Sequence, residues 1–160
     1  MVQRSERRAG KAAGNGEPVD YGPLADWVGF NLRMAQAAAF QAFSRLAKEI
    51  GTRPGRFATL MLIGRNPGIS QTALSRANGR DKSSLTPVLN DLERRGMIRR
   101  QRTRNDKRAY RLTLTPAGRK LLAQLTRCAQ THERKLDQII GAKEQKAFVR
   151  ALRRIIAEMG

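Results

Sequence analysis

The stretch from Gly68 to Gly118 most constrains the fold, because it contains two short helix patterns followed by two short strand patterns. The second helix pattern starts after Asp81, whose carboxylate can cap a helix N-terminus. It stops at Gly96, a residue type that ends helices in the left-handed conformation. Between these two residues, apolar side chains recur with helical spacing at Leu85, Val88, Leu89 and Leu92. The pattern predicts an amphipathic helix with one buried side.

A second helix and a hairpin flank this helix. The run SQTALSRANG predicts a short helix that begins after Ser70 and stops at Asn78 and Gly79. After Gly96, MIRRQR and AYRLTL have strand character, and the intervening TRNDKR contains turn formers. Helix, turn, helix and basic hairpin in this order predict a winged helix-turn-helix. The expected fold class is mainly α with a small antiparallel β wing.

The charge of the chain is concentrated on the same stretch. The chain has 32 lysines and arginines against 13 aspartates and glutamates, a net charge of +19. Between Arg80 and Lys120 there are thirteen cations and four anions, a net +9 in about a quarter of the chain. A field of this sign attracts polyanions and steers association with nucleic acid. The distribution therefore favours a nucleic-acid surface on the second helix and the hairpin.

The polar side of the second helix and the hairpin tip supply candidate DNA contacts. Short polar groups and a guanidinium on a helix side that has no acid can reach phosphates or base edges in a major groove. The predicted DNA-binding residues are Thr72, Ser83, Ser84, Pro87, Asn90, Arg94, Arg104, Lys107 and Arg108. A solvated helix face and a charged loop in solvent are the alternative interpretations. Pro87 removes one hydrogen bond inside the helix and predicts a local kink.

Three segments resemble the MarR family of transcription regulators: PGRFATLMLIGRNPGISQTALSR, DKSSLTPVLNDLERRGMIRR and NDKRAYRLTLTPAGR. The resemblance covers roughly Leu24 to Met159, and its most specific part is the run from Asp106 to Gly118. It implies that Asp106 supports the wing by pairing with a nearby arginine while Arg108 reaches the DNA. It also implies a homodimer whose interface is formed by the first helix and the last two.

The chain divides into a tail and one domain. Residues 1–23 are polar and lack periodic apolar positions, so we expect a disordered tail, with a DNA-touching arm as the alternative. Residues 24–160 are expected to form a single domain, in which 24–53 and 117–160 are dimerisation helices and 54–116 is the winged helix-turn-helix. The helix patterns outside the Gly68–Gly118 stretch are Leu24 to Ile50, Arg56 to Arg65, Ala117 to Ile140 and Lys143 to Met159. They carry more apolar surface than a small winged domain covers, which also predicts a homodimer.

A small-molecule site is predicted from an apolar set with a polar handle, the usual composition of such sites. Its residues are Asn31, Arg33, Met34, Phe57 and Met61. The chain is similar to family members that control aromatic-acid catabolism, particularly those that respond to hydroxycinnamoyl-CoA thioesters such as p-coumaroyl-CoA. The phosphates of such a ligand would suit Arg33, Arg53 or Arg56 as anchors. A free phenolic acid is the alternative effector.

No catalytic or metal-binding constellation is present in the sequence. The single histidine, His132, has no neighbours at ligand spacing and is expected to be exposed. The single cysteine, Cys128, lies on an apolar stripe, where a thiol behaves as a small hydrophobe rather than as a redox switch. The apolar runs are shorter than the roughly 18 residues that span a bilayer. We therefore expect a cytoplasmic protein that is not an enzyme, needs no cofactor and binds no membrane.

These patterns together predict a ligand-responsive repressor. A homodimer would place two recognition helices in successive major grooves of double-stranded DNA, about 34 Å apart, on a pseudo-palindromic operator. A small aromatic effector would release the operator by favouring another conformation. The alternative is a sequence-indifferent architectural nucleic-acid-binding protein, for which the net charge suffices. Asn90 favours the repressor, because phosphate binding does not need an amide.

Overall fold

The computed structural model describes residues 19–53, 55–102 and 110–160. It divides into two compact units, Met1–Ala39 and Phe40–Gly160. The predicted wing-tip residues Arg104, Asp106, Lys107 and Arg108 lie outside the described residues, as does most of the predicted tail.

The first unit contains a break that the sequence pattern does not predict. Its elements are the 3-10 helix η1 (Gly22–Asp26) and the beginning of α1 (Val28–Lys48). The sequence predicts one helix from Leu24 to Ile50, but Trp27 is extended, with φ −79° and ψ 125°, and separates η1 from α1. Asn31 Nδ2 donates to the carbonyl oxygens of Ala25 and Trp27, each at 2.9 Å. The amide that was expected in an effector cleft therefore satisfies the carbonyls at the break.

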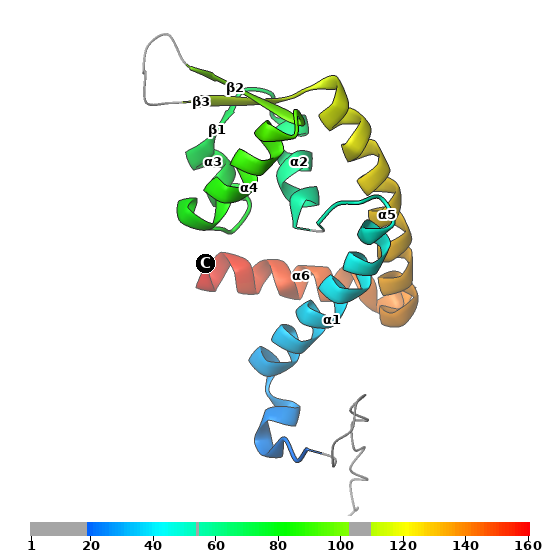
Figure 1. Ribbon diagram of the computed structural model, residues 1–160. Helices are drawn as coiled ribbons and strands as arrows, with labels where there is room; N and C mark the ends of the chain where they lie inside the picture. The colour runs from blue at the N-terminus through cyan, green and yellow to red at the C-terminus, as the bar shows by residue number, and fades with distance from the viewer. Residues whose placement is uncertain (1–18, 54, 103–109) are drawn as a thin grey trace, which may run out of the picture. The chain divides into compact units, whose positions relative to one another are not determined.

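The second unit confirms the predicted fold class. It contains the rest of α1 and then α2 (Arg56–Arg65), β1 (Ile69–Ser70), α3 (Gln71–Ala77), α4 (Lys82–Arg94), β2 (Ile98–Arg102), β3 (Tyr110–Leu114), α5 (Pro116–Ile140) and α6 (Ala142–Met159). The strands form an antiparallel sheet in the order β1-β3-β2, with α3 and α4 beside it (Figure 1). The hairpin of β2 and β3 is the wing, and α3 with α4 is the helix-turn-helix.

The helix ends follow the predicted caps. The Ser70 side chain accepts from Ala73 N at 3.1 Å and begins α3. Asp81 Oδ1 accepts from Ser84 N at 2.7 Å and begins α4. Gly96 has φ +69°, a conformation that a side chain would strain. The helix α4 continues through Pro87 from Lys82 to Arg94.

The hydrophobic core of the second unit lies between the helix-turn-helix, the sheet and α5. The buried side chains are Ala47, Leu60, Ile63, Leu74, Leu85, Leu89, Leu92, Ile98, Leu112 and Leu125. The predicted apolar stripe of α4 supplies three of them, while Val88 is half-buried. Burying this stripe fixes which side of α4 is left exposed.

One junction joins α4, the wing and α5. Thr115 Oγ1 lies 2.6 Å from Gly96 O and 3.2 Å from Met97 O, and it accepts from Gly118 N at 3.0 Å. A β-carbon on Gly118 would lie 1.9 Å from Met97 O. Only glycine therefore lets the first turn of α5 approach the root of the wing this closely.

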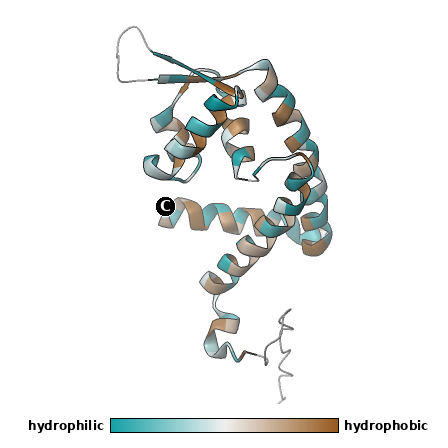
Figure 2. Ribbon diagram, viewed as in Figure 1, coloured by the Kyte–Doolittle hydropathy of each residue, from teal (hydrophilic) through white to brown (hydrophobic). Residues whose placement is uncertain are grey.

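The last helix leaves its apolar side uncovered. In the single chain α6 has no buried residue, and Phe148, Ile156 and Met159 are 43%, 71% and 83% exposed. Hydrophobic positions recur along α6 in Figure 2, on a helix that also carries many charges. An amphipathic helix in this condition has an apolar side available for a further partner.

Candidate nucleic-acid interface

The predicted DNA-reading side of α4 is exposed. Ser83, Ser84, Pro87, Asn90 and Arg94 are all exposed, as is Thr72 on α3. The structure therefore brings the helix-turn-helix candidates to accessible positions on two adjacent helices. A contact between Gln71 Nε2 and Thr86 Oγ1, 2.8 Å, links α3 to α4. The sequence pattern does not predict this contact, because two polar side chains carry no periodic signal.

The hydroxyls of the two serines at the start of α4 donate to Asp81, the capping residue. Ser83 Oγ donates to Asp81 Oδ1 at 2.6 Å, and Ser84 Oγ donates to the Asp81 carbonyl at 3.1 Å. The hydrogen bond from Ser83, with that from the Ser84 backbone, lowers the pKa of Asp81 to about 2. A lowered carboxyl pKa means that this cap stabilises the fold above the ordinary pKa and is lost as the pH falls through about 2.

A carboxylate on α4 holds two arginines. Asp91 Oδ1 accepts from Arg94 at 2.7 Å, and Asp91 Oδ2 pairs with Arg56 at the start of α2. The Arg56 side chain is only 10% exposed, and burial lowers its pKa while the Asp91 charge opposes this. An arginine stays charged even so. The Arg94 side chain remains 75% exposed, so its pairing with Asp91 leaves it accessible.

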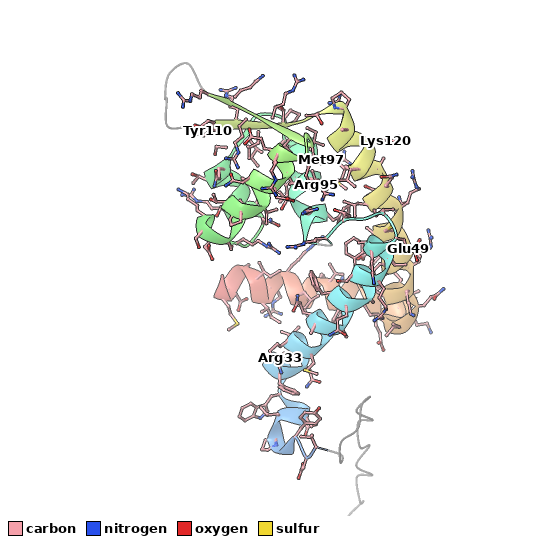
Figure 3. The ribbon with its side chains drawn as sticks, viewed as in Figure 1. Arg33, Glu49, Arg95, Met97, Tyr110 and Lys120 are labelled. Atoms are coloured by element: carbon pink, nitrogen blue, oxygen red, sulfur yellow. The ribbon has the colours of Figure 1, made fainter. Side chains whose placement is uncertain are left out.

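The described strands of the wing present exposed cations and one inward-facing arginine. Arg99, Arg102 and Arg111 are exposed on the two strands, and the Arg102 guanidinium lies 5.9 Å from the centre of the Tyr110 ring. Tyr110 marks the start of β3 in Figure 3. Arg100 instead donates to Asn90 Oδ1 on α4 at 2.7 Å. The wing strands thus add positive charge next to the exposed side of α4.

A cavity of about 820 Å³ lies beside α4 and carries four arginines. Its lining residues are Phe40, Ser44, Arg53, Gly55, Arg56, Arg80, Pro87, Val88, Asn90, Asp91 and Arg94. The only carboxylate in this set is Asp91, and it is paired with Arg56 and Arg94. In the part of the chain that the structure describes, Arg53 and Arg80 pair with no carboxylate. We call this site the four-arginine cavity.

The predicted effector residues are distributed over both units. Asn31, Arg33 and Met34 belong to the first, where the Arg33 guanidinium lies 5.2 Å from the Phe30 ring centre. In the second unit, the ring centres of Phe57 and Phe43 lie 5.7 Å apart. Met61 lines a different cavity of about 660 Å³ between α2, β3 and α5. Of the predicted phosphate anchors, Arg53 and Arg56 line the four-arginine cavity.

The expected exposure of His132 is wrong. Its side chain is 12% exposed, and its ring lies edge-on to Phe43 with centres 5.7 Å apart. The helical spacing in this part of α5 did not distinguish this inward position. Cys128 is half-buried, with Sγ 3.8 Å from Leu46 O. Among residues 19–53, 55–102 and 110–160, no group of three histidines, cysteines or acids could hold a metal ion.

Comparison with known proteins shows which family has this arrangement of helices and wing. Residues 50–109 match a family model described as the MarR family. Over 136 residues the chain is 35% identical to a transcriptional regulatory protein for the hcr operon of Thauera aromatica, covering 84% of this chain and 82% of the relative. The chain belongs to the MarR family. It is a transcriptional regulator of that family.

Solved structures agree with the MarR fold over nearly the whole length. The transcriptional repressor CouR bound to a 23-mer DNA duplex has a TM-score of 0.80 and 30% identity, covering 88% of this chain and 99% of CouR. CouR bound to p-coumaroyl-CoA has a TM-score of 0.79 and 29% identity, covering 89% of this chain and 99% of that one. No helix among the described residues of this MarR protein is long and apolar enough to cross a membrane.

Proposed function

We propose that this chain is a ligand-responsive repressor that binds a pseudo-palindromic operator as a homodimer and leaves it when an aromatic acyl-CoA binds. The ligand assignment rests on the four-arginine cavity, because this cavity adjoins the exposed side of α4. A ligand that binds there contacts the helix that we assign to operator recognition. It can therefore favour one position of α4 over another through its differential affinity.

The charge of the cavity favours a polyanion over a simple acid. Four arginines and one aspartate leave a net charge of +3 on the lining. The carboxylate of a free phenolic acid offsets one of these charges, whereas the phosphates of a CoA thioester offset several. Phe40, Pro87 and Val88 supply apolar surface for an aromatic acyl group. The solved complex of CouR with p-coumaroyl-CoA supports this choice of ligand.

Uncovered apolar side chains support the homodimer. Trp27 and Val28 in the first unit are 60% and 67% exposed, and the apolar side of α6 is uncovered in the second. Burying such surface against a second copy is favourable at about 25 cal/mol per Å². A two-fold dimer then presents two copies of α4 to two half-sites.

The test starts from duplexes selected from a random library, because a repressor enriches one operator. Melting temperature and operator affinity are then measured with p-coumaroyl-CoA, p-coumarate and CoA. We expect p-coumaroyl-CoA to stabilise the protein by about 2.7 kcal/mol at 100 times its Kd and to release the operator. Release by p-coumarate alone contradicts the acyl-CoA assignment. Equal affinity for all duplexes contradicts the repressor and supports architectural binding.

Arg53→Gln tests the cavity directly. Arg53 lines the cavity without a carboxylate partner in the described residues, so its removal should weaken p-coumaroyl-CoA binding about tenfold, through loss of a charge-assisted contact. Arg127→Gln is the matched control, since Arg127 is exposed on α5 and does not line this cavity. Titration calorimetry of both variants decides the point, and equal losses would place the ligand elsewhere.

Arg94→Ala should weaken operator binding more than binding to random duplexes. Arg94 lies on the proposed reading side of α4 with 75% of its side chain accessible. Loss of a base contact costs about 1–3 kcal/mol, which is roughly five- to 150-fold in affinity. Fluorescence anisotropy without effector measures both affinities. Equal losses on the two kinds of DNA would assign Arg94 to a phosphate.

A further inference from the structure

The side chain of Arg100 connects the wing to the proposed DNA-reading helix. It extends from β2 with 16% of its surface exposed, and its Nη2 donates to Asn90 Oδ1 at 2.7 Å. Its Nε lies 3.3 Å from Glu93 Oε2, an ionic contact rather than an aligned hydrogen bond. Asn90 and Glu93 lie three residues apart on α4 and are neighbours on its surface. Arg100 therefore holds two adjacent positions of one helix.

The chemistry of a guanidinium decides which way the Asn90 amide faces. Arginine has only donors, whereas an asparagine amide has one acceptor oxygen and one donor NH2 group. Arg100 can therefore contact only Oδ1, whichever way the amide is drawn. The two N–H bonds of Nδ2 are left for another partner. Asn90 itself is exposed, so that partner can be external to the chain.

We infer that Asn90 acts on DNA as a hydrogen-bond donor and that Arg100 is the positioning residue that keeps it so. The inference rests on the proposed repressor function. An asparagine that reads adenine bidentately accepts from N6 and donates to N7. In this chain Oδ1 already accepts from Arg100, and the cation beside it repels the amino hydrogens of adenine or cytosine. Asn90 therefore favours a base that presents a hydrogen-bond acceptor to it, such as a purine N7 or thymine O4.

The inference is tested with single-atom changes in the selected operator. Comparing wild type with Asn90→Ala on every single base-pair change locates the position that Asn90 contacts. Where that position holds adenine, replacement by 7-deazaadenine removes the N7 acceptor. Replacement by a purine without the 6-amino group removes the N6 donor. Wild-type affinity should fall about fivefold or more with the first change, the loss of one hydrogen bond. It should change less than about twofold with the second.

Variants of the two residues separate positioning from folding. Asn90→Asp keeps the side-chain size and the contact with Arg100 but removes both N–H donors, so dependence on N7 should vanish. Arg100→Met frees the amide to turn, so the 6-amino group should then contribute to affinity. Arg100→Lys keeps a donor-only cation and should retain the wild-type pattern. Arg99→Met, on an exposed neighbour in β2, should weaken binding evenly without changing the pattern.

Three results would overturn the inference. The first is wild-type affinity that depends on the 6-amino group. The second is an Arg100→Met protein with the wild-type pattern; if that variant does not fold, an Asn90→Asp protein that still depends on N7 has the same force. The third is an Asn90→Ala protein with unchanged base preferences. That result would refute the role of Asn90, but operator binding and the proposed repressor function would stand. Failure to select any operator would instead refute the proposed function.

Discussion

Leu152→Glu is expected to separate the proposed dimer and to abolish tight operator binding. Leu152 lies on the apolar side of α6, between the exposed side chains of Phe148 and Ile156. A glutamate there would be buried without a partner in the dimer, at a cost of several kcal/mol for each ion. In a two-fold interface the substitution occurs twice. About 3 kcal/mol for each copy gives about 6 kcal/mol, or roughly 10⁴-fold weaker dimerisation.

Operator affinity falls with the dimer because one winged domain contacts only one half-site. Analytical ultracentrifugation at micromolar concentration measures dissociation, and anisotropy measures operator affinity. Ala147→Glu is the matched control, since it adds the same charge at an exposed position on the other side of α6. That variant should remain a dimer. A wild-type monomer that binds its operator tightly would refute the dimeric architecture.

Gly118→Ala is expected to destabilise the fold more than any other glycine-to-alanine change in an α-helix of the second unit. The added β-carbon would lie 1.9 Å from Met97 O and 2.9 Å from Met97 C, both backbone atoms. Relief requires α5 to move away from the root of the wing, which also lengthens the contact of Thr115 Oγ1 with Gly96 O. We expect a loss of about 3 kcal/mol, at the upper end for overpacking, and a melting temperature lower by about 6–12 °C.

Gly64→Ala provides the comparison for this change. A β-carbon on Gly64 would lie 3.0 Å from Leu114 Cδ1 and 3.0 Å from Leu122 Cδ2, the ends of flexible side chains. Alanine also gains up to about 1 kcal/mol of helix propensity over glycine. The net loss should therefore stay below about 1 kcal/mol. Calorimetric unfolding of both variants measures the difference, and equal stability would show that the wing root yields easily.

Local chemistry explains which parts of the fold were predictable. Ser70 and Asp81 cap their helices through their own side chains, and Gly96 ends α4 in the conformation that glycine favours. Such signals lie within a few residues of the feature that they specify. The spacing of Leu85 and Leu89 likewise indicates the buried side of α4 before any tertiary contact is known.

Features that depend on distant partners were not predictable in the same way. The strand β1 has two residues, Ile69 and Ser70, and exists because β3 pairs with it. The break at Trp27 interrupts a run whose composition suits a continuous helix. The four-arginine cavity joins residues from 40 to 94, so no short motif reveals it. The Asn90–Arg100 contact similarly depends on how β2 returns across α4.

The Thr115 junction makes a mechanical coupling between the elements that we assign to DNA binding. Gly96 ends α4, Met97 leads into the wing, and Thr115 with Gly118 begins α5. Because one hydroxyl and one close backbone contact hold all three, we expect a rotation of α5 about this point to turn α4 and the wing together. The DNA contacts that we assign to α4 and to the wing would then be gained or lost in one step. A repressor built on this joint should leave its operator abruptly, without an intermediate bound through the wing alone.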